Sequence, residues 1–311
     1  VMRMQIGPQE YWLVSDPDAI RHVLVENAKN YVKSPNYVGL KLVLGQGLVT
    51  SEGELWKRQR RLASPAFTHK KLEGFVPTFV DAVEKMLDGW ERTGVTELDA
   101  HEAMSRLTLS IVGRCLFDVD LGAAATQGHA EAFGKVLHFA NEYSFAPVKL
   151  PIGTPLPSFI AFRRALRELD TLVDGIIRER RTRVARGESP GDDLLATFLS
   201  ARDDGGAAMD DKQLRDEVMT MVGAGHETTA NALAFTLRLL SQHPDVERRV
   251  YEEVRALVGD RPMSAADLPK LAYTERVIKE SMRLLPPVWV IERQNLEDDV
   301  IAGYHLPKGT V

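Results

Sequence analysis

The chain has 311 residues, of which 44% are hydrophobic and 27% are charged, and its formal net charge is −5. This composition is typical of a globular protein with enough chain for a sizeable core, and the mild acidity argues against nucleic-acid binding. The single cysteine, Cys115, excludes an internal disulfide and a zinc site built on cysteine pairs. Because no run of about 18 apolar residues occurs, we expect a soluble cytoplasmic protein of bacterial type, with an N-terminal membrane anchor ahead of Val1 left open.

The N-terminal residues predict a hairpin followed by a helix. Strand patterns cover residues 1–6 and 11–14, and Gly7-Pro8 is typical of a turn between them. Asp16-Pro17 then opens a helix, because Asp16 can accept hydrogen bonds from the first free N–H groups and proline suits the first helical position.

Helical patterns dominate from residue 54 onward. The predicted helices cover residues 54–62, 68–90, 98–116, 128–142, 158–186, 192–200, 210–242, 243–258 and 271–284. Residues 288–311 are expected to form strands and turns. No linker divides the chain, so we predict a single domain over residues 1–311 that is mainly α with small β-sheet pieces.

The segment 210–242 predicts an unusually long helix of about 50 Å. From residue 218 to residue 237 it is apolar or small on nearly every face, and its ionisable residues there are His226 and Glu227. A helix that is apolar all round is a buried one, so we expect this helix to run through the core.

The middle of this helix reads Gly-Ala-Gly-His-Glu-Thr-Thr over residues 223–229. The small residues leave a flat surface, which suits either a planar ligand or the close approach of another helix. The part from Ala224 to Thr229 resembles the oxygen-binding motif of the cytochrome P-450 family, Ala/Gly-Gly-x-Asp/Glu-Thr-Thr/Ser. His226 takes the variable position of that motif and is interpreted as incidental.

Three further matches occur in the order found in this family. Glu280 and Arg283 fit its Glu-x-x-Arg pattern and share one helix face. Trp56 and Arg60 share a face of a short helix, and Arg293 follows an apolar strand. The resemblance therefore covers the whole chain and implies the cytochrome P-450 fold.

The resemblance implies a site for haem b. Trp56 and Arg60 would bond a haem propionate, which fits a pure N–H donor and a permanent cation. Arg293 is similar to a further propionate-binding position. Ala224 and Gly225 would lie against the distal face of the haem.

The resemblance also implies catalytic roles. Thr228 would hydrogen-bond dioxygen and its reduced forms, and Glu227 would help to relay protons. Glu280 and Arg283 would be structural and hold the proximal side of the core, although such a pair alone is also typical of an ordinary exposed helix.

The implied activity is that of a monooxygenase, which inserts one oxygen atom from O2 into a hydrophobic organic substrate. Its two electrons would come from a ferredoxin- or flavin-type donor that draws on NAD(P)H. An apolar run would line the substrate pocket: Val288, Trp289, Val290 and Ile291. A basic cluster suits either an acidic redox partner or a solvated helix face: Lys57, Arg58, Arg61, Lys70 and Lys71.

One feature of the family is missing from this sequence. Its iron ligand is a cysteine thiolate in a Phe-x-x-Gly-x-Arg-x-Cys loop, whereas Cys115 lies in an apolar helical stretch and is expected to be a buried core residue. We therefore expect no metal ligand within the chain, a ligand cysteine beyond Val311, a domain incomplete at both ends, and no activity of the chain as it stands. A haem-free helical binding module or pseudoenzyme, and a peroxygenase or isomerase use of the haem, stay open.

Overall fold

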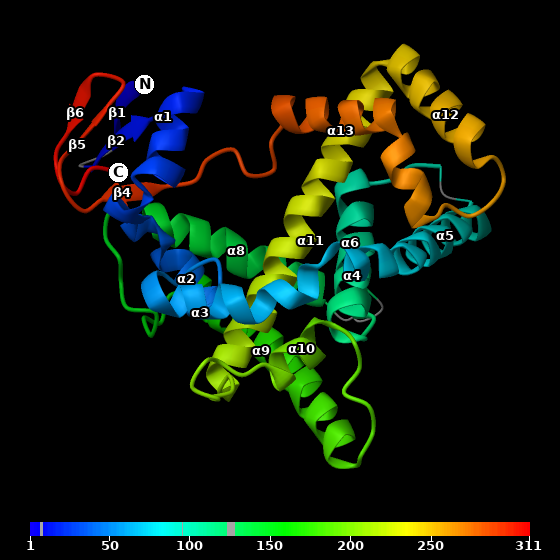
Figure 1. Ribbon diagram of the computed structural model, residues 1–311, viewed down its shortest axis with the longest axis horizontal. Coiled ribbons are helices and arrows are strands. Elements are labelled where there is room, and N and C mark those ends of the chain that lie inside the picture. The colour runs from blue at the N-terminus through cyan, green and yellow to red at the C-terminus, as the bar shows by residue number, and fades with distance from the viewer. Residues whose placement is uncertain (7–8, 95, 123–127) are drawn as a thin grey trace.

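The computed structural model describes residues 1–6, 9–94, 96–122 and 128–311. The described chain is mainly helical, with short strands gathered at one end (Figure 1). The longer helices are α1 Pro17–Arg21, α2 Val38–Leu44, α3 Gly53–Ala63, α4 His69–Gly74, α5 Val76–Thr93, α6 Ala100–Phe117, α8 His129–Phe145, α9 Pro157–Ala185, α10 Leu194–Ser200, α11 Asp211–Gln242, α12 Pro244–Val258 and α13 Ala272–Leu284. The mainly α prediction with small sheet pieces is confirmed.

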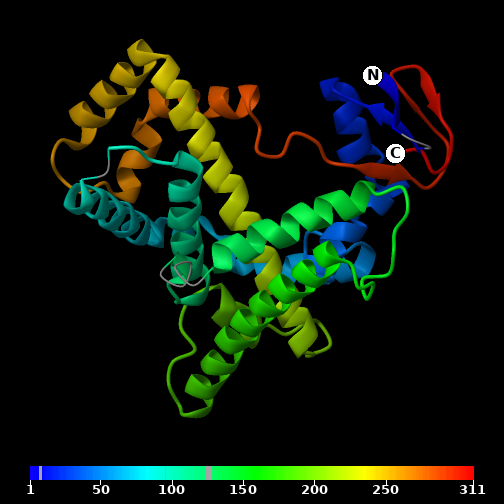
Figure 2. The same cartoon turned by 180° about the vertical axis from the view of Figure 1, so that it is seen from behind.

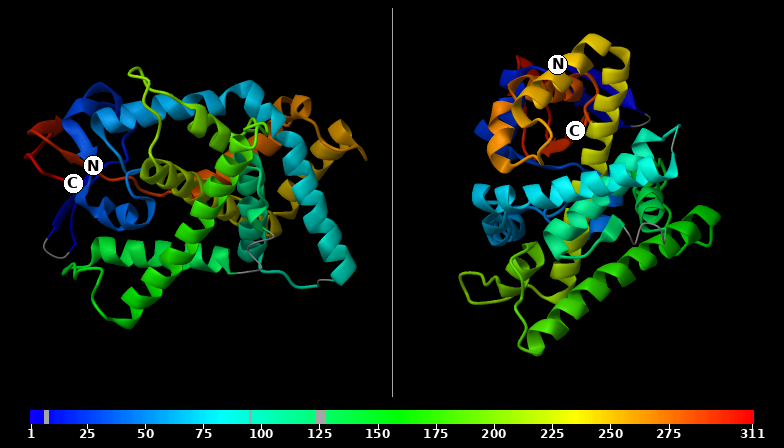
Figure 3. Two further views of the ribbon diagram at one scale, coloured as in Figure 1. Left: turned by 90° about the horizontal axis from the view of Figure 1, so that it is seen from below. Right: turned by 90° about the vertical axis from the view of Figure 1, so that its right-hand side faces the viewer.

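The strands form two-stranded antiparallel pairs. The predicted hairpin is confirmed as β1 (Met2–Ile6) and β2 (Gln9–Leu13), and its predicted turn at Gly7-Pro8 lies outside the described residues. β3 (Tyr31–Lys33) pairs with β4 (Arg293–Asn295), and β5 (Asp299–Ile301) pairs with β6 (Tyr304–Leu306). The C-terminal segment therefore returns to the N-terminal one, and both termini lie at the same end of the molecule, opposite α12 (Figure 3).

The main core lies between α2, α6, α8, α9, α10 and the N-terminal half of α11. Phe139 of α8 stacks on Phe162 of α9, with ring centroids 4.3 Å apart, and both rings are buried. Figure 2, which views the molecule from behind, shows these two helices in front of α11. A smaller apolar cluster joins α5, α6 and the second half of α11, so α11 contributes to both clusters.

Local signals set the limits of α11 largely as predicted. Its N-cap Asp210 accepts a hydrogen bond from the Gln213 N–H at 2.7 Å, and the helix ends at Gln242, before His243-Pro244. The predicted helix over residues 68–90 is instead interrupted between α4 and α5, because Pro77 lies in the first turn of a new helix.

None of the helices in the described part of the chain is both long and apolar enough to span a bilayer.

Candidate functional site

The N-terminal half of α11 is buried and bonded to the loop between α2 and α3. The backbone N–H of Gln46 donates to Asp216 Oδ2 at 2.9 Å, and that of Leu48 donates to Glu217 Oε2 at 3.1 Å. Gly45 has a φ of +56°, and a Cβ there would lie 2.2 Å from the Asp216 carboxylate. The loop can therefore approach these carboxylates because position 45 is glycine.

Glu217 is the more isolated of these two carboxylates. It is 1% exposed, and its Oε1 finds no hydrogen-bond partner among the described residues. Burial raises the pKa of Glu217 to about 7, and the Leu48 N–H opposes that shift. The group is therefore largely neutral below pH 7.

The middle of α11 is open on one face. Ala224 is exposed, Thr228 is partly exposed, and the Thr228 hydroxyl donates to the Ala224 carbonyl at 2.7 Å. This bond along the helix holds the hydroxyl oxygen on the open face, where it can still accept a hydrogen bond. The helix thus runs through the core as expected, but its central segment leaves one face uncovered.

Glu227 lies on the flank of the open face and is half-buried. Burial raises the pKa of its carboxyl group, and His101 at the start of α6 opposes the rise. In the described part of the chain its side chain makes no hydrogen bond or ion pair. A carboxylate with a raised pKa and free oxygens is suited to accept and release protons.

The two glycines of the motif serve packing. A Cβ at Gly225 would lie 3.1 Å from Val112 of α6, and one at Gly223 would lie 3.6 Å from Leu44 of α2. Helices α6 and α2 thus approach α11 at its glycines. This favours the second of the two uses predicted for these small residues, the close approach of another helix. Contact of Ala224 and Gly225 with a haem face stays a prediction.

Trp56 and Arg60 lie one turn apart on α3, with Trp56 39% exposed and Arg60 exposed as well. Among the described residues, neither the Trp56 indole N–H nor the Arg60 guanidinium bonds a protein group. Two donors that share a helix face and lack protein partners are available to an anionic ligand.

Arg293 begins β4 and lies directly opposite Lys33 of β3. Burial and the nearby Arg293 lower the pKa of Lys33 to about 8, and the Lys33 ammonium donates to the Ser51 carbonyl. Like charges placed opposite each other on paired strands repel, and the Glu52 carboxylate beside Lys33 offsets part of this repulsion. Lys33 was not predicted as a site residue, because the β3–β4 pairing joins segments about 260 residues apart.

Glu280 and Arg283 form an exposed ion pair on α13. The Arg283 guanidinium donates to both Glu280 oxygens, at 2.6 and 2.7 Å, and both side chains are more than half exposed. The bond holds the Glu280 pKa below its usual range. The predicted structural role of this pair beyond its own helix stays a prediction.

The predicted pocket residues, expected to form an apolar strand before Arg293, instead lie in the irregular stretch that leads from α13 to β4, so the strand prediction is wrong there (Figure 1). All four are exposed, and Trp289 is the most exposed at 77%: Val288, Trp289, Val290 and Ile291. Exposed apolar residues in such a run mark a surface that a ligand or another part of the protein covers.

The basic cluster of α3 and α4 is largely paired. Arg58 donates to Asp203 at 2.7 Å, and Lys71 donates to Asp192 at 2.8 Å. Arg61 pairs with Asp204 in the same loop as Asp203. These pairs favour the solvated-face alternative over a free docking surface.

Cys115 is a buried core residue, as predicted. Burial raises the pKa of its thiol to about 11, so it is not a thiolate at neutral pH. Among the described residues, no group of three or more histidine, cysteine, aspartate or glutamate side chains could hold a metal ion.

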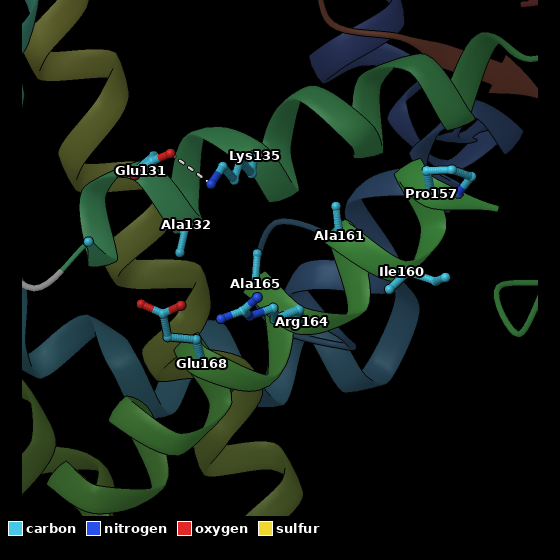
Figure 4. A pocket seen from close by; sticks show the side chains of 10 residues that line it. Glu131, Ala132, Lys135, Pro157, Ile160, Ala161, Arg164, Ala165 and Glu168 are labelled. Carbon is cyan, nitrogen blue, oxygen red and sulfur yellow. Dashed lines mark ion pairs between the residues drawn. The ribbon is translucent and has the colours of Figure 1, made fainter. Parts of the chain in front are cut away.

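A groove of about 740 Å³ lies elsewhere, between α8 and α9 (Figure 4). Its lining combines Ala132, Ala161 and Ala165 with charged side chains, among them the ion pair of Lys135 with Glu131. None of the predicted site residues lines it, so the groove is separate from the candidate site.

Comparison with known proteins places the chain among its relatives. The family model described as Cytochrome P450 matches residues 1–311. The chain is 32% identical over 310 residues to pentalenene oxygenase of Streptomyces avermitilis, covering 100% of this chain and 68% of that protein. It is 33% identical over 312 residues to cyclooctat-9-en-7-ol 5-monooxygenase of Streptomyces melanosporofaciens, covering 100% and 66%.

A plant protein is similarly close. Protein LUTEIN DEFICIENT 5, chloroplastic, of Arabidopsis thaliana is 32% identical over 324 residues, covering 99% of this chain and 54% of that protein. The chain therefore spans between about half and two-thirds of the length of these relatives.

Proposed function

This chain belongs to the cytochrome P450 family, and on that premise we propose that it is part of a haem-dependent monooxygenase. The enzyme inserts one oxygen atom from O2 into a hydrophobic organic substrate with two electrons from a redox partner. The observation that carries the proposal is the open face of α11, where Thr228 lies beside a half-buried Glu227 that bonds none of the described residues.

The residues present fit the distal face and the propionates of a haem. Ala224 offers a flat, exposed surface for a planar group. Among the described residues, Trp56 and Arg60 are donors without protein partners, and Arg293 adds positive charge beside Lys33, which Glu52 offsets in part. The axial thiolate is not supplied by Cys115, whose thiol is buried and protonated.

A bound haem supplies the oxidative chemistry, and the protein supplies placement and protons. Thr228 offers its hydroxyl oxygen on the open face while its proton is held by the Ala224 carbonyl. Glu227 accepts protons from solvent and passes them on, because burial raises its pKa toward neutrality. The apolar residues 288–291 exclude water and favour a hydrophobic substrate.

The names of two relatives suggest substrates to try. Pentalenene oxygenase and cyclooctat-9-en-7-ol 5-monooxygenase are named for apolar compounds, so pentalenene is a suitable probe for this chain. A ferredoxin or a flavoprotein serves as the electron donor.

The test is the yield of product per NAD(P)H consumed by the full-length, haem-loaded enzyme of which this chain is part. We expect Thr228→Ala to lower that yield about 10-fold or more while consumption continues. Thr236→Ala is the control, because that hydroxyl lies eight residues further along α11 and bonds the Ala232 carbonyl and the Ser281 hydroxyl. Equal yields in both variants would refute the role of Thr228, and full activity with peroxide alone would favour a peroxygenase.

A further inference from the structure

His226 lies in the middle of the motif but on the opposite side of α11 from its open face. At 3.6 residues per turn, Thr228 is about 200° around the helix from His226, and Ala224 is equally far in the other direction. His226 is 3% exposed, and the phenyl ring of Phe133 in α8 is 6.0 Å from its ring. His226 was interpreted as incidental, but its buried position between α6 and α8 suggests a structural role.

Helix α6 bonds His226 at two points. The His226 Nε2 atom lies 2.9 Å from the Ser105 hydroxyl, and the Thr108 hydroxyl lies 3.1 Å from the His226 carbonyl oxygen. Thr108 has two further carbonyl oxygens of α6 within reach, so its single hydrogen is shared. The contact with Ser105 is consequently the stronger of the two.

The tautomer of His226 follows from its surroundings. Burial lowers the pKa of the ring to about 4, so the imidazole is neutral at physiological pH and carries one N–H. Nδ1 has no partner among the described residues. A buried N–H without an acceptor costs more than a bare acceptor atom, so the proton is assigned to Nε2, which donates to Ser105.

Within residues 223–229, the rest of the contact surface offers little that would fix the rotation of this segment of α11. Gly225 meets Val112 of α6 through its bare backbone, and Gly223 faces Leu44 in the same way. Small residues let helices approach but do not specify one rotation, whereas a single buried polar contact can specify register.

We propose that Ser105 and His226 are positioning residues, whose hydrogen bond fixes the rotation of the central segment of α11, residues 223–229, and thereby holds Glu227 and Thr228 at the open face. The proposal rests on the proposed function for its catalytic consequence. The structural part of the proposal is that this hydrogen bond restrains residues 223–229, and it does not depend on the proposed function.

The restraint is tested by amide hydrogen exchange on the chain without haem. His226→Phe keeps an aromatic ring next to Phe133 but removes the donor, and Ser105→Ala removes the acceptor. We expect each variant to speed exchange at residues 223–229 about tenfold, and the double variant to do no more than either one. His226→Gln, which retains an N–H donor, should restore part of the protection.

The matched control breaks another bond of the same helix. The Thr236 hydroxyl donates to the Ser281 hydroxyl of α13 at 2.8 Å. Ser281→Ala should lower stability to a similar degree without faster exchange at residues 223–229. Unchanged exchange in Ser105→Ala and His226→Phe, or a double variant whose effects simply add, would overturn the proposal.

The catalytic consequence is read in the full-length, haem-loaded enzyme of which this chain is part. We expect Ser105→Ala to lower the product formed per NAD(P)H about threefold, and Ser281→Ala to leave it unchanged. A wild-type protein that forms no product refutes the proposed function, and the exchange result still decides the positioning contact. Faster exchange together with unchanged product yield would refute the link to Glu227 and Thr228.

Discussion

Two carboxylates of α11, Glu217 and Glu227, lie ten residues apart on one helix and in opposite surroundings. Glu217 is fully buried and accepts a backbone hydrogen bond from the loop between α2 and α3. Glu227 is half-buried beside an open face and makes no hydrogen bond within the described residues. Burial raises the pKa of both groups.

The difference separates a structural from a functional use of the same side chain. A buried carboxylate is tolerated when it bonds protein groups, and its loss then leaves those groups without a partner. A carboxylate with free oxygens near an open face contributes little to stability and can exchange protons. Stability should therefore depend on the N-terminal half of α11, and activity on its central segment.

The largest expected effect concerns Asp216, which neighbours Glu217. Asp216→Ala leaves the Gln46 N–H without its acceptor and removes one acceptor of the Arg215 guanidinium, which keeps Asp170 and the Val43 carbonyl, so we expect the free energy of unfolding to fall by about 3 kcal/mol. Denaturant unfolding followed by circular dichroism measures it. Lys212→Ala is the control, because Lys212 bonds the same carboxylate from an exposed position and should cost less than about 1 kcal/mol. If both variants lost the same free energy of unfolding, the buried contacts of Asp216 would not be the ones that stabilise the fold.

The next prediction concerns how the free energy of unfolding depends on pH through His226. The folded-state pKa of His226 is about 4, below its ordinary 6.5, so the unfolded chain binds more protons between these values. Stability from His226 is therefore present above about pH 6.5 and is lost, by about 3 kcal/mol, as the pH falls toward 4.

Glu217 has the opposite sign. Its folded-state pKa of about 7 exceeds the ordinary 4.5, so its contribution is present below about pH 4.5 and is lost, by about 3 kcal/mol, as the pH rises to 7. Subtracting unfolding free energies of Glu217→Gln and His226→Phe from those of the wild type should give curves of opposite slope. Parallel curves would contradict both assignments.

A smaller effect on stability is expected at Glu227. Glu227→Gln removes a charge that has no partner, so the free energy of unfolding should change by less than about 1 kcal/mol. The haem-loaded protein should nevertheless form product more slowly, because the amide cannot relay a proton. A large loss of stability would show that Glu227 resembles Glu217 after all.

The smallest effect is expected at the exposed pair of α13. Glu280→Gln breaks a bond between two side chains that are more than half exposed, so the denaturation midpoint of this chain should not change measurably. Loss of stability as large as that of Asp216→Ala would show that the pair has partners in the core.

The sequence predicted best where local signals decide the structure. The limits of α11 follow from the N-cap Asp210 and from His243-Pro244 at its end. α2 was not predicted, because Gly39 disfavours a helix locally. In the fold, α2 lies so close to α8 that a Cβ at Gly39 would be 1.9 Å from the Ala140 carbonyl oxygen.

The site divides in the same way. The motif residues Glu227 and Thr228 could be identified from a contiguous run, whereas Lys33 and the partners of His226 depend on contacts between distant segments. The sequence also could not predict which face of α11 is buried, because residues on the open face are as apolar or small as those on the buried face.

The most direct test of the account is whether the chain distinguishes hemin from hemin dimethyl ester, in which the propionates are uncharged. Binding is followed by quenching of tryptophan fluorescence. If Arg60 and its neighbours receive propionates, hemin should bind about tenfold more tightly than the ester, and Arg60→Ala should lower that preference, while Lys212→Ala keeps it. Equal affinity for both compounds, or a preference that Arg60→Ala leaves unchanged, would contradict the proposed haem site.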